Sequence, residues 1–367
     1  IIHSIYPYKL SFNLHYNLIN QQQKKETLKM PIISITSPSH LLITIFMILL
    51  SSKMFCISLS QNLLCPTGTP KVGLPVTKED IDLLQFSENL EFLEAEYFLW
   101  AVHGYGLDIV APELAMGGPP PIGVRKANLD FFTSNIINEF AMQEVGHLRA
   151  LRSKVGGLPR PLMDLSSRHF AHLFDEAFGY KLQPPFDPYR DSLNFMLSCY
   201  ALPYAALVGY VGTNPLIQGY ESKRLLAGLL GVESGQDAMI RMYLYERAGK
   251  VVYPYRHTVA EFTIHISNLR NRLAMCGIKD EGLFVPWQLG AENRTTTNIL
   301  SADFYSLSQW RTPEEILRIM YNTGSENAHG GFFPRGANGN IAKNLLKLEC
   351  GIKNATKKSQ KKTLIKS

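Results

Sequence analysis

The fold is constrained most by a series of long segments between residues 78 and 277 in which apolar residues recur every three or four positions. Strand patterns, in which apolar and polar residues alternate, are thin across the same region. This spacing predicts an all-α protein, built as a four-helix bundle with an added fifth helix. The helices are expected, in chain order, at 78–106, 126–157, 191–212, 221–250 and 258–277.

The third segment, 191–212, is apolar nearly all round. Two interpretations are open: a helix buried on every side, or a helix broken near Pro203, where the backbone lacks an N–H donor. The connection at 106–125 is rich in proline and glycine and longer than most loops of a bundle, which predicts a loop that crosses one end of the bundle.

Two of the expected helices place ionisable side chains within their buried stripes. In the second helix, Glu144 and His147 continue a stripe of Leu, Phe and Ile at helical spacing. Burying an isolated carboxylate is so costly that the group normally acquires a partner charge, a metal or a proton. The fourth helix repeats the arrangement with Glu233, but Gln236 stands where a second histidine is expected.

Facing helices of this kind form the core of carboxylate-bridged two-metal sites. Such sites take a Glu-x-x-His motif from each of two helices and one Glu from each of two others. Residues three apart lie on one helix face, so both side chains reach the same ion. Carboxylate oxygens with imidazole favour iron or manganese. The first helix offers Glu91 or Glu94 as the inward acid, whereas Glu88 and Glu96 are expected to be solvated.

The third helix lacks the acid that a complete two-metal site needs, because no Asp or Glu occurs between Ser192 and Gly219. Three carboxylates and one imidazole remain, with Gln236 as a weak neutral oxygen donor. Such a set holds one metal or a loose pair and falls short of a dioxygen-activating dimetal centre. The candidate ligands of this degenerate site are Glu91, Glu94, Glu144, His147, Glu233 and Gln236.

Several longer motifs of the chain are specific: "EVGHLRAL", "ALPYAALVGYVGTNPLIQG", "LLAGLLGVESGQDAMIRMYLYERA" and "GGFFPRGANGNI". On these stretches, and over about residues 65–349, the chain resembles the plant desiccation-related protein family, which carries a ferritin-like domain. The resemblance implies a ferritin-like four-helix bundle, a secretory leader and expression linked to water deficit. It implies no biochemical activity.

The resemblance also implies which metal-site positions are kept and which are lost. Pro203 stands where relatives with a complete site keep a glutamate, and Gln236 replaces the histidine of the second motif. Metal catalysis is therefore not expected from the resemblance. The retained positions of the wider ferritin-like pattern are Glu91 (or Glu94), Glu144, His147 and Glu233.

Residues 1–60 are expected to be a leader and signal peptide rather than part of the fold. Translation is expected to start at Met30, and the apolar run 41–50 is too short for a bilayer, whose core needs about 20 apolar residues. Small residues before position 61 suit a cleavage there. The leader predicts a secreted protein, with the vacuole as the alternative location and a signal anchor as the alternative to cleavage.

The other boundaries follow from changes in composition. We expect a linker at 61–77, the bundle at 78–277, a loop-rich extension packed on the bundle at 278–350, and a basic disordered tail at 351–367. The net charge of +6 reflects six lysines after Glu349, so no nucleic-acid partner is expected. The lysine tail is a candidate contact for a cell-wall polymer. No stable membrane span is expected in the mature chain, and a homo-oligomer is left open.

The cysteines and two short motifs bear on the secretory route. Two glycosylation sequons begin at Asn293 and Asn354. Four cysteines allow three disulfide connectivities in an oxidising compartment, and the sequence does not choose between them. The four that follow the leader are Cys65, Cys199, Cys276 and Cys350.

Two functions from different classes remain open. The first hypothesis is a secreted, desiccation-associated and non-enzymatic protein whose dimetal site is degenerate. The alternative is an iron- or manganese-binding carboxylate protein with oxidase or metal-storage activity. The metal content of the protein separates the two, because only the second function needs a bound ion.

Overall fold

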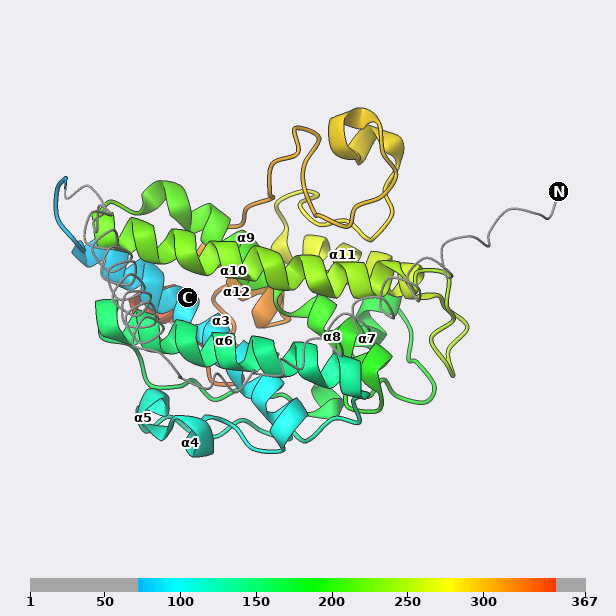
Figure 1. The fold of residues 1–367 in the computed structure, drawn as a ribbon, viewed down its shortest axis with the longest axis horizontal. Helices are drawn as coiled ribbons and strands as arrows, with labels where there is room; N and C mark the ends of the chain where they lie inside the picture. The colour runs from blue at the N-terminus through cyan, green and yellow to red at the C-terminus, as the bar shows by residue number, and fades with distance from the viewer. Residues whose placement is uncertain (1–71, 348–367) are drawn as a thin grey trace, which may run out of the picture. The chain divides into compact units, whose positions relative to one another are not determined.

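The computed structural model describes residues 72–347, and over this range all regular secondary structure is helical apart from isolated bridges. The all-α expectation is confirmed. The helices are α3 (Lys78–His103), α4 (Leu107–Val110), α5 (Pro112–Ala115), α6 (Phe131–Val155), α7 (Ser167–Phe178), α8 (Ser192–Ala201), α9 (Tyr204–Thr213), α10 (Tyr220–Tyr245), α11 (Val259–Ala274) and α12 (Pro313–Met320), with short 3-10 turns η1 (Asn214–Leu216), η2 (Trp287–Leu289) and η3 (Ala291–Asn293) (Figure 1).

Helices α3, α6 and α10 form the bundle together with the consecutive pair α8 and α9 (Figure 1). The most extensive packing is between α3 and α6, and α10 contacts α6, α8 and α9. Helix α11 packs on α7, α8 and α12 at the side of the bundle. The four longest bundle segments therefore surround one interior, into which their buried stripes point.

Helix α3 begins where the sequence predicts and is buried on almost every side. Thr77 caps it, and the side chains of Thr77 and Asp80 each bond the other's backbone N–H. The helix ends at Gly104, whose φ of 79° lies in the left-handed region that suits glycine. The expectation that Glu88 and Glu96 are solvated is wrong, since the exposed fraction of Glu88 is 1% and that of Glu96 is 0%.

The burial of Glu88 and Glu96 has a cause that lies far away in the chain. Arg160, itself buried, donates to the carboxylate of Glu96 and to Asp108 in α4. One face of α3 is thus covered by the loop between α3 and α6 and by the segment after α6. In a simple bundle this face would be exposed to solvent. The glycine-rich loop further along contributes too, because Asn338 and Asn89 bond each other.

Both interpretations of the third segment hold at once. It is broken at Leu202 and Pro203 into α8 and α9, and nearly every residue of both helices is buried. Among the described residues, the stretch Ser192–Leu216 is long and apolar enough to cross a bilayer, but 83% of its most apolar window is buried inside the protein. That burial is typical of the core helix of a bundle.

Helix α7 is absent from the helices that the sequence analysis expects. Ser166 caps it, and its apolar residues fall on one side, from Phe170 to Phe178. The sequence of these twelve residues has a clear amphipathic pattern, which predicts a helix at this position. The predicted loop at 106–125 contains the short helices α4 and α5, and α5 packs on α6.

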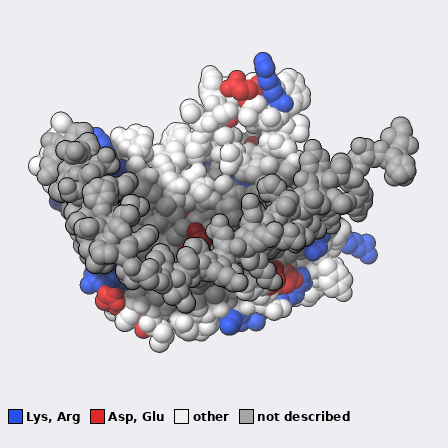
Figure 2. All heavy atoms as spheres, viewed as in Figure 1, with Lys and Arg blue, Asp and Glu red and all other residues white. Residues whose placement is uncertain are grey.

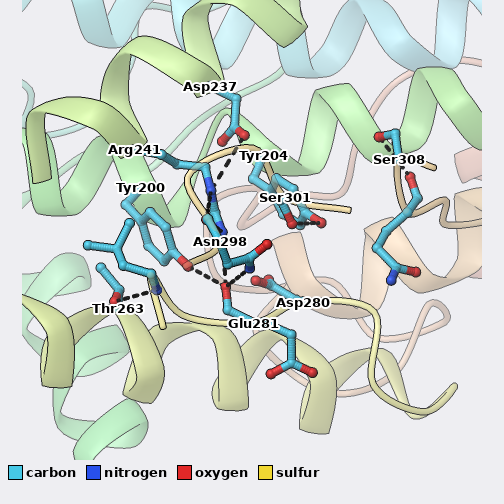
Figure 3. A network of polar contacts seen from close by, with 12 residues as sticks. Tyr200, Tyr204, Asp237, Arg241, Thr263, Asp280, Glu281, Asn298, Ser301 and Ser308 are labelled. Atoms are coloured by element: carbon cyan, nitrogen blue, oxygen red, sulfur yellow. Dashed lines mark hydrogen bonds and ion pairs between the residues drawn. The ribbon is translucent and has the colours of Figure 1, made fainter. Parts of the chain in front are cut away.

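The described part of the extension is held to the bundle by buried polar side chains (Figure 3). Arg241 of α10, which is fully buried, donates to the carbonyls of Asn298 and Glu281. Tyr200 of α8 also donates to the Glu281 carbonyl, at 2.9 Å. The residues that anchor the extension therefore belong to the bundle helices.

The remaining expectations for the ends of the chain fall largely outside the described residues. The leader, most of the linker, Cys65, Cys350, Asn354 and the lysine tail all lie there. Cys199 is buried and Cys276 is exposed, and the two do not pair with each other.

Candidate metal centre

Three helices bring four buried ionisable residues to one point in the bundle. Glu91 comes from α3, Glu144 and His147 from α6, and Glu233 from α10. One ligand atom from each lies within 4.8 Å of the others. The carboxylates of all three glutamates are 0% exposed, and the His147 side chain is 10% exposed. The four donor atoms are close enough together to hold a metal ion between them.

His147 Nδ1 is the centre of the cluster. It lies 2.9 Å from Glu91 Oε2 and 3.1 Å from Glu144 Oε2, one helical turn earlier. Glu233 Oε1 lies 3.5 Å away, at the outer limit for a hydrogen bond. A single imidazole nitrogen therefore faces three carboxylates that come from three helices.

The two other candidates lie beside the cluster. Gln236, one turn after Glu233, is 2% exposed and donates through Nε2 to Glu144 Oε1 at 2.6 Å. It therefore orients Glu144 through its amide nitrogen. Glu94 is also buried, but it is not one of the four residues whose ligand atoms converge. Of the two inward acids of α3, the structure brings Glu91 to His147.

The third bundle segment contributes a hydroxyl. Tyr210 of α9 is buried and donates its O–H to Glu91 Oε1. This contact is not among the sequence-based expectations, which concern the missing acid and Pro203, two turns earlier. An aromatic residue with a polar tip in a fully apolar helix was the available indication, since a buried tyrosine hydroxyl usually finds a partner.

The ionisable groups of the cluster differ in the direction of their pKa shifts. Burial by itself raises the pKa of Glu91, but the charge of His147 and the hydrogen bond from Tyr210 outweigh burial and hold that pKa below its ordinary value. Burial lowers the pKa of His147, yet the charge of the Glu91 carboxylate and the interactions with Glu144 and Glu233 reverse this, so its pKa lies well above the ordinary range. Without a metal, Glu91 and His147 form an ion pair.

The other carboxylates favour a proton instead. Burial raises the pKa of Glu94 well above its ordinary value, and the charges of neighbouring glutamates add to the effect. The pKa of Glu144 is raised well above its ordinary value by burial first and then by the Glu233 charge. Burial raises the pKa of Glu233 to about 7. Three buried carboxyl groups thus face one imidazole, with Glu94 beside them, and a divalent cation would replace the protons that otherwise neutralise these groups.

Unpaired buried oxygens test whether these residues fit a metal. Both carboxylate oxygens of Glu233 are buried without a hydrogen bond from any described residue, and so are Glu94 Oε2 and Gln236 Oε1. Buried polar atoms normally have partners, so oxygens without a hydrogen bond in and beside this cluster favour a bound ion. Hard oxygen donors with one imidazole match iron or manganese. The residues therefore fit a metal ion.

The bundle and the cluster together define a class of protein: a ferritin-like domain with carboxylates and an imidazole at its centre. A family model of the ferritin-like domain matches residues 79–246.

Two relatives extend the match beyond the bundle. Ferritin-like catalase Nec2 of Nesocodon mauritianus is 63% identical over 309 residues, which are 84% of this chain and 98% of that protein. Desiccation-related protein PCC13-62 of Craterostigma plantagineum is 52% identical over 264 residues, 72% of this chain and 84% of that protein. The chain belongs to this desiccation-related, ferritin-like family. No solved structure matches it.

These findings correct the functional expectation. The hypothesis of a non-enzymatic protein with a degenerate site is wrong: a relative identical at 63% of positions is a ferritin-like catalase, and the Glu91, Glu144, His147 and Glu233 cluster is intact and buried. The error came from requiring a second histidine on α10 and an acid on the third helix. The alternative, a metal-binding carboxylate protein, agrees better with the findings.

Proposed function

We propose that this protein is a metal-dependent catalase, which converts two molecules of hydrogen peroxide into two of water and one of dioxygen. The observation that carries the proposal is the buried convergence of Glu91, Glu144, His147 and Glu233. The name of the relative Nec2, a ferritin-like catalase, supports it. Iron or manganese would be held by these four residues, with Glu94 as a further oxygen donor beside them.

The reaction consists of two half-reactions that exchange electrons and protons. One peroxide gives up two electrons and two protons to become dioxygen, and the second takes up two of each and becomes two waters. A metal ion held by Glu91, Glu144, His147 and Glu233 would supply the redox chemistry that links the two half-reactions. The protein must supply positions where two protons are held between these events.

The chain offers such positions next to the cluster. Glu94 has a raised pKa and an unpaired Oε2, so this carboxyl group is suited to carry a proton. Tyr210 and Gln236 fix the orientation of Glu91 and Glu144 through hydrogen bonds, which leaves their other oxygens for an ion. Burial of all these groups keeps bulk water away from the reacting peroxide.

Metal analysis and oxygen evolution test this proposal together. Protein produced with manganese or iron in the medium is expected to contain near-stoichiometric metal and to release dioxygen from hydrogen peroxide. Glu144→Ala and Glu233→Gln are expected to lose both properties. The exposed change Glu79→Gln, on the same bundle, is the control and should keep both. Metal-loaded protein that releases no dioxygen contradicts the proposal.

We also propose that the protein acts outside the cytoplasm without a nucleic-acid partner. Asn293, which begins a sequon, is exposed in the extension, where a glycan has room. On the face that Figure 2 shows, the described basic side chains lie in small separate groups, several of them beside acidic ones. Enzymatic deglycosylation of protein from its native tissue tests the first point by a shift in mass.

A further inference from the structure

A groove runs between α6 and α10 and ends at the candidate metal centre. Its volume is about 510 Å³, and its lining includes His147, Ala150 and Lys154 from α6 and Gly228 and Leu229 from α10. His147 is thus both a member of the buried cluster and part of a surface cavity.

Within the cluster, the imidazole is the part that solvent reaches. The His147 side chain is 10% exposed, while the carboxylates of Glu91, Glu144 and Glu233 are 0% exposed. Nδ1 faces the three carboxylates, so the opposite edge of the ring is left to face the groove. A molecule that enters the groove meets this edge of the His147 ring before it meets any carboxylate of the buried cluster.

Two of the residues that line the groove have a small side chain or none. Ala150 lies one turn after His147 on α6, and Gly228 lies on the facing helix. A Cβ atom added at Gly228 has no atom within 4 Å, so a side chain there would extend into open space. Glycine within a helix costs about 1 kcal/mol relative to alanine. Gly228 has this unfavourable effect on helix stability, and a side chain at this position would narrow the groove.

The outer end of the groove carries an ion pair. Lys154 Nζ of α6 lies 2.7 Å from Glu221 Oε2 of α10, and the two side chains are 44% and 36% exposed. Seven residues separate Lys154 from His147, which is about 10 Å along a helix. The groove is therefore a short passage, with opposite charges paired at its mouth and an imidazole at its floor.

We propose that the groove between α6 and α10 is the route by which peroxide reaches the metal centre, and that the small residues Gly228 and Ala150 keep it open. This proposal rests on the catalase function above. A small uncharged hydroperoxide needs no charged partner to enter such a groove.

A pair of glycine substitutions tests the route. Gly228→Leu fills the groove, whereas Gly231→Leu places the same side chain on the same helix at an exposed position that also has open space and does not line the groove. For metal-loaded protein, Gly228→Leu is expected to lower kcat/KM for hydrogen peroxide by about tenfold or more, as a misfit of a few methyl groups does in shaped pockets. Gly231→Leu is expected to match the wild type, and both should have unchanged metal content and melting temperature.

A graded variant sharpens the result. Gly228→Ala is expected to fold at least as stably as the wild type and to lower kcat/KM in the same direction by a smaller factor. Equal kcat/KM values for Gly228→Leu and Gly231→Leu would overturn the route.

The rate of metal uptake gives a readout that does not depend on catalysis. Protein stripped by a chelator is mixed with manganese, and bound metal is measured over time by elemental analysis. Slower uptake in Gly228→Leu than in Gly231→Leu supports the route even if the wild type releases no dioxygen, an outcome that defeats only the catalase proposal. Equal uptake rates together with equal kcat/KM values defeat only the route.

Discussion

At the scale of single residues, Tyr210 shows how a helix without acids still takes part in the centre. Its hydroxyl donates to Glu91 and so fixes the carboxylate that pairs with His147. Partners of this kind orient metal ligands, and their removal typically weakens metal binding by about 10- to 100-fold. The third bundle segment thus contributes to the site by positioning a ligand from α3.

Tyr210→Phe is expected to raise the dissociation constant for manganese by about 10- to 100-fold. Competition with a chelator of known affinity measures it. Tyr204→Phe is the matched control on the same helix, because that hydroxyl bonds the Lys279 carbonyl and Ser301 in the extension. If both variants bind manganese equally well, the positioning role of Tyr210 is wrong.

Glu88 carries a pH dependence of stability. Burial raises its pKa from 4.5 to about 8, and the charge of Glu91 adds to this. Between these values the folded protein keeps the proton while the unfolded chain has lost it, so the free energy of unfolding falls as pH rises from 4.5 to 8. Glu88→Gln is expected to flatten this part of the profile, measured by urea denaturation.

The exposed change Glu79→Gln, also in α3, should leave the wild-type profile as it is. A Glu88→Gln profile that falls as steeply as the wild type between the same two pH values would show that Glu88 is ionised in the folded state. The comparison is made with chelated protein, so that bound metal does not alter the neighbouring carboxylates.

At the scale of elements, Arg241 attaches the extension to α10. It is fully buried, bonds the carbonyls of Asn298 and Glu281, and lies 3.9 Å from Asp237 (Figure 3). Burial raises the pKa of Asp237 to about 6, in spite of the neighbouring arginine charge. Loss of the guanidinium leaves the Asp237 carboxylate and the Asn298 carbonyl without this partner, while the Glu281 carbonyl keeps its bond from Tyr200.

Arg241→Met is therefore expected to destabilise the protein by about 3 to 5 kcal/mol, the usual effect of breaking a buried pair on one side. The extension should become sensitive to limited proteolysis before the bundle does. Lys223→Met, at an exposed position of the same helix, is expected to change stability by less than about 0.5 kcal/mol. Equal proteolysis rates in the two variants would show that other contacts hold the extension.

At the scale of the whole molecule, the metal centre links the helices that form the bundle. Its ligands come from α3, α6 and α10, so an ion that binds only the folded chain stabilises the entire bundle. At a metal concentration 1,000 times the dissociation constant this linkage is worth about 4 kcal/mol. A chelator is expected to lower the melting temperature of the wild type and to leave that of Glu233→Gln unchanged.

Acid should act on the centre in the same direction as a chelator. The pKa of Glu233 is raised to about 7 by burial, so below neutral pH protons compete with the metal for this carboxylate. Metal content after dialysis is expected to fall as the pH is lowered through 7. A dissociation constant for the metal that stays the same as the pH is lowered through 7 would show that Glu233 is not a ligand.

The sequence alone determined the helical class, the start of α3, and the positions of Glu144, His147 and Glu233 within buried stripes, because these follow from a local period of 3.6 residues. Only the tertiary structure decided that Glu91 rather than Glu94 meets His147, that Tyr210 reaches the cluster, and that Glu88 and Glu96 are buried. Those outcomes depend on the rotation of packed helices about their axes and on distant segments, such as the one that carries Arg160, that cover a helix face. The sequence pattern of one helix shows neither how that helix is rotated in the bundle nor which distant segments cover it.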